Sequence, residues 1–173
     1  LEMWRQADHV TVYALPDLAA LSVQWDTGAD TARAAELQEN TYGGDWQALL
    51  TALFTADIRK VGHNIKDTMR TLLERGVDPK GYIFDTALAA YLLDATAGSY
   101  DLQRLFVAYF NEELPKPAHL EKDAFAPLGD TAAAWAALHS YGSAVAALYD
   151  ILPEKLREMD MTELYETVEL PLC

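Results

Sequence analysis

The sequence predicts an α/β domain in which helices pack on the faces of a central sheet. Its 173 residues, 51% of them hydrophobic, are enough for one domain with one substantial core. Two short runs rich in β-branched and aromatic residues lie near the N-terminus, and such runs are typical of strands. From residue 45 onward, short strand-like runs alternate with apolar stripes at helical spacing, which indicates an α/β layer arrangement.

The N-terminal part of the chain is predicted to form a β-hairpin. Residues 9–15 (HVTVYAL) and 18–25 (LAALSVQW) are the two strand-like runs, and Pro16 and Asp17 between them favour a turn. Residues 26–44 are polar and rich in alanine, and they include glycines. This stretch is compatible with a third strand or with a short helix, and the sequence does not decide between them.

A strand and two helices are predicted between residues 45 and 76. Asp45 is a suitable N-cap for the first helix, whose apolar side chains recur at helical spacing. These side chains are Trp46, Leu49, Leu50, Leu53 and Phe54. A strand over residues 58–62 follows, and a second helix over residues 64–74 ends before Gly76.

The next predicted elements are a short strand at residues 82–84 and two helices. Asp85 directly precedes an apolar helix over residues 86–93, so we predict that it caps this helix. A further helix is predicted to begin near Ser99, which is a candidate N-cap. It carries the apolar side chains of Leu102, Leu105, Phe106, Tyr109 and Phe110. Prolines enclose residues 115–127, which we predict to be an irregular surface loop.

The longest predicted helix follows Asp130, which is a suitable N-cap. Its buried positions recur at spacings of three and four: Trp135, Leu138, Gly142, Val145, Tyr149 and Leu152. Leu138 and Gly142 are therefore expected to share one face. A final helix is predicted to run from about residue 161 to Cys173 without a polar tail, and we expect the chain to be part of a longer protein.

The charge of the chain argues against strong DNA binding by this domain alone. Its 27 acidic and 13 basic side chains give a net charge of −14, whereas non-specific affinity for nucleic acid comes from Lys and Arg. The longest apolar runs fall well short of the roughly 20 residues that span a bilayer. The single cysteine, Cys173, has no partner for a disulfide. We therefore expect a soluble, cytoplasmic protein that does not contact membranes.

Three segments, taken together, resemble the 3′-5′ exonuclease-like domain of bacterial family A DNA polymerases, that is, of DNA polymerase I. They are residues 60–77 (KVGHNIKDTMRTLLERGV), 81–94 (GYIFDTALAAYLLD) and 166–172 (ETVELPL), and residues 18–25 fit the second strand of that domain. The resemblance implies a ribonuclease H-like 3′-5′ exonuclease fold with a central mixed β-sheet flanked by helices. It also implies that residues 1–173 form a single domain, whose last residues begin the connection to a polymerase domain.

The residues that carry catalysis in this family are replaced here. In active members, four carboxylates hold two divalent metal ions that activate water for phosphodiester hydrolysis. The carboxylates come as Asp-x-Glu on the first strand, the Asp of Asn-x-x-x-Asp, and the Asp of Tyr-x-x-x-Asp on a late helix. The four carboxylate positions are occupied by Tyr13, Leu15, Thr68 and Gly142, the tyrosine position by Leu138, and the asparagine position by Asn64.

We therefore predict that this domain has no catalytic residues and holds no metal ion, and that apolar side chains partly close its former cleft. The resemblance implies a vestigial, inactive exonuclease domain that supports DNA-directed DNA synthesis by the parent chain. That parent would be a nucleotidyltransferase of DNA replication and repair, and Mg²⁺ is expected only in its polymerase domain. The expected partners are this polymerase domain and, through the parent protein, DNA.

Two other functions remain open. An active metal-dependent 3′-5′ exonuclease with displaced acidic ligands would need Asp17, Asp67 and Asp85 to converge, although Asp67 lies about 100° around the helix from the family position. An independent protein-binding module would instead present an exposed apolar patch. The isolated His63 is best explained as a hydrogen-bonded structural residue. No glycine-rich phosphate loop, Ser-His-Asp arrangement or nucleophilic cysteine is visible.

Overall fold

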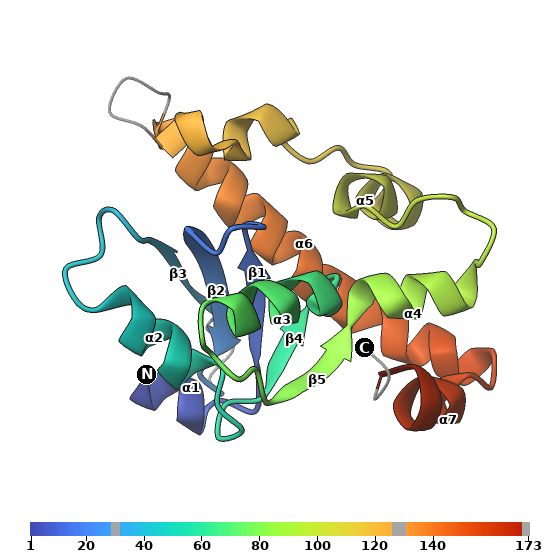
Figure 1. Cartoon of the computed structure of the whole chain (residues 1–173). Helices are drawn as coiled ribbons and strands as arrows, with labels where there is room; N and C mark the ends of the chain where they lie inside the picture. The colour runs from blue at the N-terminus through green and yellow to red at the C-terminus, as the bar shows by residue number, and fades with distance from the viewer. Residues whose placement is uncertain (29–31, 126–130, 171–173) are drawn as a thin grey trace.

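The computed structural model of the protein describes residues 1–28, 32–125 and 131–170. A five-stranded mixed sheet with the order β3-β2-β1-β4-β5 forms its centre (Figure 1). The strands are β1 (Val10–Ala14), β2 (Ala20–Asp26), β3 (Ala32–Gln38), β4 (Lys60–Gly62) and β5 (Tyr82–Asp85). The predicted α/β architecture is confirmed, and the stretch that the sequence leaves undecided contains the edge strand β3.

The register of the sheet places side chains of three strands on one face. Strands β1 and β2 form the predicted antiparallel hairpin, with Tyr13 opposite Ser22, and Ser22 in turn lies opposite Glu36 of β3. Strands β4 and β5 continue the sheet in parallel on the other side of β1. Because directly opposite residues in a sheet point to the same side, Tyr13, Ser22 and Glu36 share a face.

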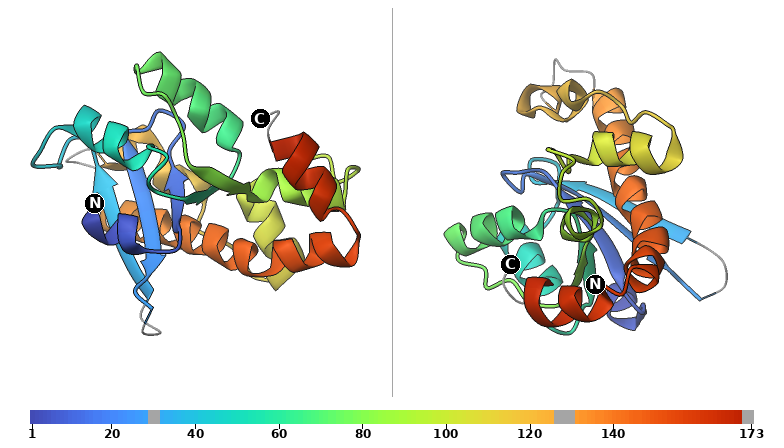
Figure 2. Two further views of the ribbon diagram at one scale, coloured as in Figure 1. Left: turned by 90° about the horizontal axis from the view of Figure 1, so that it is seen from below. Right: turned by 90° about the vertical axis from the view of Figure 1, so that its right-hand side faces the viewer.

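Helices cover both faces of the sheet. The α-helices are α1 (Glu2–Gln6), α2 (Trp46–Leu53), α3 (Ile65–Glu74), α4 (Thr86–Leu93), α5 (Leu102–Phe110), α6 (Thr131–Glu158) and α7 (Thr162–Leu164). Three short turns of other helix types are η1 (Pro117–Leu120), η2 (Lys122–Phe125) and η3 (Tyr165–Glu169). Figure 2 shows α2 and α3 on one face of the sheet and the long helix α6 on the other. Among the described residues, no helix combines the length and apolarity that a membrane span requires.

Alternation along the strands divides the core into two layers. Val10 and Val12 of β1 belong to the same buried cluster as Leu50 of α2 and Leu72 of α3. Tyr13 follows Val12 in β1, and its side chain points to the opposite face of the sheet, toward α6. Each fully buried aliphatic side chain contributes roughly 1.5–3 kcal/mol, so both helical layers are held mainly by apolar burial.

The C-terminal segment returns to the middle of the fold. Tyr165 of η3 is 1% exposed, and its ring lies against Phe84, with 4.8 Å between ring centroids. The Tyr165 hydroxyl accepts a hydrogen bond from the backbone N–H of Asp85 at 2.6 Å and donates to the Asp85 carbonyl at 3.3 Å. These contacts join the end of the described chain to the junction of β5 and α4.

Helix α5 begins later than the sequence predicts. We expected Ser99 to cap it, but α5 starts at Leu102, and Asp101 occupies the N-cap position without a side-chain hydrogen bond. The Ser99 hydroxyl instead accepts a hydrogen bond from the backbone N–H of Asp101 at 3.3 Å. Serine commonly bonds the backbone two residues ahead, so this side chain stabilises the turn before the helix.

Two other segments also differ in detail from the prediction. The proline-bounded region contains the 3-10 helices η1 and η2 where we expected only irregular loop. The final helix is the short α7, followed by a π-helical turn at η3. The predicted cap Asp130 and the predicted helix end at Cys173 lie outside the described residues.

Candidate functional site

The site predicted from the sequence lies at the end of β1, beneath α6. Two adjoining cavities, of about 670 Å³ and about 840 Å³, open there. Their linings share four residues: Tyr13, Pro16, Gln103 and Tyr141. The carboxyl ends of the parallel strands β1, β4 and β5 meet at this edge, where α/β sheets generally bind their ligands.

A pair of stacked tyrosines occupies the boundary between the two cavities. The ring of Tyr13 lies against that of Tyr141 in α6, with 5.3 Å between centroids and 25° between the ring planes. The Tyr141 hydroxyl donates to the carbonyl of Pro115 at 2.6 Å and accepts from Gln103 Nε2 at 3.0 Å. Burial raises the pKa of Tyr13 to about 12, so its hydroxyl is neutral at physiological pH. The centre of the site therefore carries no charge from these rings.

Leu15 and Leu138 form an apolar cluster beside the tyrosine pair. Leu15 is 6% exposed and Leu138 is fully buried, and the two belong to one cluster with Ala20. The sequence resemblance predicts that Leu15 replaces the glutamate of the family pattern and that Leu138 replaces its tyrosine. Neither side chain offers an oxygen to a metal ion.

Gly142 of α6 contacts β2 so closely that any added side chain would have to displace Ser22. A Cβ atom built on Gly142 would lie 2.3 Å from Ser22 Oγ and 2.8 Å from Ser22 Cβ. The helix residue that faces Tyr13 is Tyr141, one position earlier. An aspartate at position 142, where the predicted register places the family carboxylate, would therefore collide with Ser22.

The second motif lies at the start of α3. Asn64 adopts the left-handed conformation with φ 56°, and its side-chain Nδ2 donates to Asp67 Oδ2 at 2.7 Å. Asp67 also forms an ion pair with Arg70 on the exposed side of the helix. Thr68 is half-buried and lines the larger cavity. Asp67 thus lines the cavity while bound to its own helix neighbours.

Asp85 caps two helices at once. It is 4% exposed, and its carboxylate accepts from the backbone N–H groups of Asn64 at 2.8 Å and Ile65 at 3.0 Å, where α3 begins. The same carboxylate accepts from Ala87 N–H at 2.9 Å at the start of α4. The predicted cap is confirmed, and the second helix that it serves was not foreseen. A buried carboxylate is stable here because two helix N-termini surround it.

The three acids considered for a displaced metal site do not form one. Asp17 lines the smaller cavity, whereas Asp67 and Asp85 line the larger one. Within residues 1–28, 32–125 and 131–170, no three His, Cys, Asp or Glu side chains gather closely enough to hold a metal ion. Divalent ions of the Mg²⁺ type need several oxygen ligands, so the residues at the family positions do not fit a two-metal centre.

His63 contributes hydrogen bonds to the wall of the larger cavity. Its Nδ1 lies 2.8 Å from Thr86 Oγ1, and its Nε2 lies 2.9 Å from the carbonyl of Tyr100. Burial lowers the pKa of His63, and this effect exceeds the opposing influence of the Asp85 charge. Both ring nitrogens thus have partners within the fold, which suits the structural role predicted for this residue.

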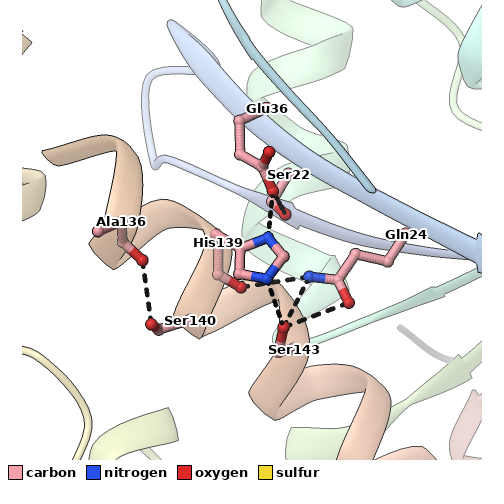
Figure 3. Close-up of polar contacts among 7 residues, drawn as sticks. All are labelled: Ser22, Gln24, Glu36, Ala136, His139, Ser140 and Ser143. Atoms are coloured by element: carbon pink, nitrogen blue, oxygen red, sulfur yellow. Dashed lines mark hydrogen bonds and ion pairs between the residues drawn. The ribbon is translucent and has the colours of Figure 1, made fainter. Parts of the chain in front are cut away.

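A cluster of hydrogen-bonded polar side chains where α6 meets β2 and β3 was not predicted from the sequence (Figure 3). His139 Nδ1 lies 2.7 Å from Glu36 Oε1, and Ser143 Oγ lies 3.5 Å from His139 Nε2. Gln24 Nε2 donates to Ser143 Oγ at 3.0 Å and to the His139 carbonyl at 3.2 Å. The order Ser-His-Glu resembles a nucleophile relay, but Gln24 engages Ser143 directly, so the group fastens α6 to β2 and β3. The i, i+4 spacing of His139 and Ser143 is visible in the sequence, whereas Glu36 could not be found because β3 was undecided.

Comparison with known proteins identifies the family and the fold of the chain. Residues 10–157 match the family described as 3′-5′ exonuclease. Among solved structures, the chain is similar to Pol1 from M. smegmatis in complex with DNA primer-template and dNTP, with 26% identity and a TM-score of 0.74 over 99% of this chain. It spans only 28% of the length of that M. smegmatis chain.

Two further solved structures share the fold at lower identity. Brucella melitensis NrnC with bound Mg²⁺ is 17% identical, with a TM-score of 0.64 over 94% of this chain and 80% of that one. Escherichia coli RNase D, an exoribonuclease involved in structured RNA processing, is 18% identical, with a TM-score of 0.58 over 95% of this chain and 46% of that one. The mixed sheet with flanking helices is thus the ribonuclease H-like exonuclease fold, and the chain belongs to the 3′-5′ exonuclease family.

Proposed function

We propose that this chain is a non-catalytic 3′-5′ exonuclease-like domain of a DNA polymerase I, and that it supports DNA synthesis by the polymerase part of its parent. The observation that carries the proposal is the stacked pair of Tyr13 and Tyr141 at the centre of the cleft. The close contact between Gly142 and Ser22, which an added side chain would have to disturb, adds to it.

The chemistry of the cleft supports the loss of hydrolysis. Two-metal hydrolysis depends on carboxylate oxygens that hold both ions beside the scissile phosphodiester. Tyr13 presents a neutral hydroxyl, Leu15 a hydrocarbon and Gly142 no side chain. The nearest acid of the second motif, Asp67, is paired with Arg70. Metal binding in this domain is therefore not expected, and Mg²⁺ would serve only the polymerase domain of the parent.

The similarity to Pol1 supports the assignment to a polymerase. It extends over 99% of the chain at 26% identity, higher than the 17% and 18% found with NrnC and RNase D. Residues 1–173 would then be one domain of a longer cytoplasmic nucleotidyltransferase that acts in DNA replication and repair. Its partners would be the polymerase domain of the same chain and, through the parent, DNA. With a net charge of −14, the isolated domain is expected to bind DNA weakly.

A nuclease assay tests the proposal. The purified domain is incubated with a 5′-labelled single-stranded oligonucleotide in Mg²⁺ and, separately, in Mn²⁺. We expect no metal-dependent shortening from the 3′ end. Metal-dependent shortening that disappears in an Asp67→Asn/Asp85→Asn variant would instead support an active exonuclease with displaced acidic ligands.

The choice of substitution follows from the structure. Alanine at Asp85 would remove the acceptors at the starts of α3 and α4, so lost activity could reflect unfolding. Asparagine keeps one acceptor oxygen and removes the charge. Asp57→Asn is the matched control, because Asp57 is exposed and lines neither cavity. Shortening that persists equally in all variants identifies a contaminating nuclease.

A further inference from the structure

The smaller cavity has walls that suit an organic ligand. Its volume of about 670 Å³ lies within the range of small-molecule sites. Tyr13 and Tyr141 form one side, and Leu120 and Phe125, from η1 and η2, also line it. Leu15, which is buried, contributes to the apolar lining. The proposed function makes no use of this cavity.

The charged residues of the lining favour a cation. Three carboxylates line the cavity, at Asp17, Glu39 and Glu121, against one guanidinium, at Arg75. Arg75 is already engaged, because its Nη2 lies 3.3 Å from Glu39 Oε2 and donates to the backbone carbonyl of Asp17 at 2.9 Å. Among the side chains that the structure describes, no cation forms an ion pair with the carboxylate of Asp17 or Glu121. The lining thus carries two carboxylates, at Asp17 and Glu121, that pair with no described cation.

We propose that this cavity binds a small amphipathic organic cation, an ammonium group carried on an apolar body. The apolar body would occupy the space between the tyrosine pair and the side chains of Leu120 and Phe125. The ammonium group would lie toward Asp17 and Glu121, within reach of the ring face of Tyr13, since aromatic faces attract cations. The same two carboxylates, and the net charge of −14 on the whole chain, would repel an anionic ligand such as a nucleotide.

The test compares ligands that differ mainly in charge. Phenethylamine, 2-phenylethanol and 3-phenylpropionate share an aromatic body and carry, at neutral pH, a positive charge, no charge and a negative charge. Thymidine monophosphate serves as the nucleotide probe. Binding is measured by NMR titration of the amide signals of the ¹⁵N-labelled chain. We expect phenethylamine to bind about tenfold more tightly than 2-phenylethanol, with shifts that map to the cavity lining.

Charge variants locate the source of the preference. Asp17→Asn/Glu121→Gln is expected to reduce the ammonium-over-alcohol preference at least about threefold, because it removes the charges of both carboxylates. Asp57→Asn/Glu112→Gln removes the same net charge from exposed positions outside the cavity, and it is expected to keep the preference. Tyr13→Leu should weaken phenethylamine binding more than 2-phenylethanol binding.

Several results would overturn the proposal. They are equal binding of ammonium and alcohol, tighter binding of thymidine monophosphate or 3-phenylpropionate, shifts that map outside the cavity, and no binding of any probe. If the Asp57→Asn/Glu112→Gln control also lost the preference for the ammonium ligand, the preference would come from the overall charge of the chain. That result would likewise refute a cation site in the cavity. None of these results depends on the nuclease assay, so the two proposals can fail separately.

Discussion

Substituting Gly142 with alanine should destabilise the protein, although the same change inside most helices is stabilising. In a helix interior, glycine costs roughly 0.5–1 kcal/mol relative to alanine. Here the added Cβ would lie 2.3 Å from Ser22 Oγ, 2.8 Å from Ser22 Cβ and 3.0 Å from Gln24 Nε2. Overpacking of this kind typically costs about 1–3 kcal/mol, so the collision outweighs the gain in helix propensity. We expect a net loss of about 1–2 kcal/mol in the free energy of unfolding.

Urea unfolding of the single and double variants measures this effect. Glycine at position 22 removes both colliding atoms, so Ser22→Gly should relieve most of the cost of Gly142→Ala despite its own cost in the strand. The double-mutant cycle isolates their coupling, which we expect to exceed about 1 kcal/mol. Ser140→Ala on the same helix is the control and should change stability by no more than about 0.5 kcal/mol.

A stabilised Gly142→Ala variant would refute this reasoning, as would a double variant with no coupling. Either result would mean that α6 can move away from β2 at little cost. A carboxylate at position 142 would then become sterically possible. The fit between Gly142 and Ser22 would no longer support the proposed loss of the third motif.

Three further predictions concern other charged residues. Burial lowers the pKa of Lys60 to about 8, well below its unfolded value near 10.5. At a pH between these two pKa values, unfolding therefore takes up a proton. The free energy of unfolding should therefore rise by up to about 1.4 kcal/mol per pH unit above pH 8, and Lys60→Met should flatten this slope in urea titrations from pH 8 to 9.5. Asp85→Ala should cost about 2–3 kcal/mol in thermal or urea unfolding because two helix starts lose their cap, whereas Asp85→Asn should cost less; equal costs would contradict the double-cap interpretation. Glu36→Gln should cost no more than about 1 kcal/mol because its partner His139 is exposed, and 1 M NaCl should shrink the difference from the parent protein.

The elements with strong local signals were predictable from the sequence. Helices α2 and α4 follow acidic residues, Asp45 and Asp85, whose carboxylates accept hydrogen bonds from the first turns. Strand β3 was undecided because its sequence, ARAAELQ, lacks alternation of polar and apolar residues and lies at the sheet edge. Helix α1 was missed because it has only five residues, and isolated short helices carry little signal.

The site was only partly predictable, for reasons of geometry. The replacements at Tyr13 and Leu15 could be read from the first strand, but the packing partner of Tyr13 could not. Neighbouring residues on a helix point about 100° apart, so only the structure decides that Tyr141 faces Tyr13 while Gly142 faces Ser22. The double cap at Asp85 likewise joins segments twenty residues apart, at Ile65 and Asp85, and no local pattern reveals it.

The contact between Tyr165 and Asp85 links the C-terminal segment to the beginnings of two helices. The tyrosine hydroxyl bonds both backbone groups of the residue whose carboxylate caps α3 and α4. Native-state hydrogen exchange should therefore register the C-terminal turn and these two helix starts as one cooperative opening unit. A pull on η3 would therefore be transmitted by the Tyr165 side chain to Asp85, which lines the larger cavity and holds the first turns of α3 and α4.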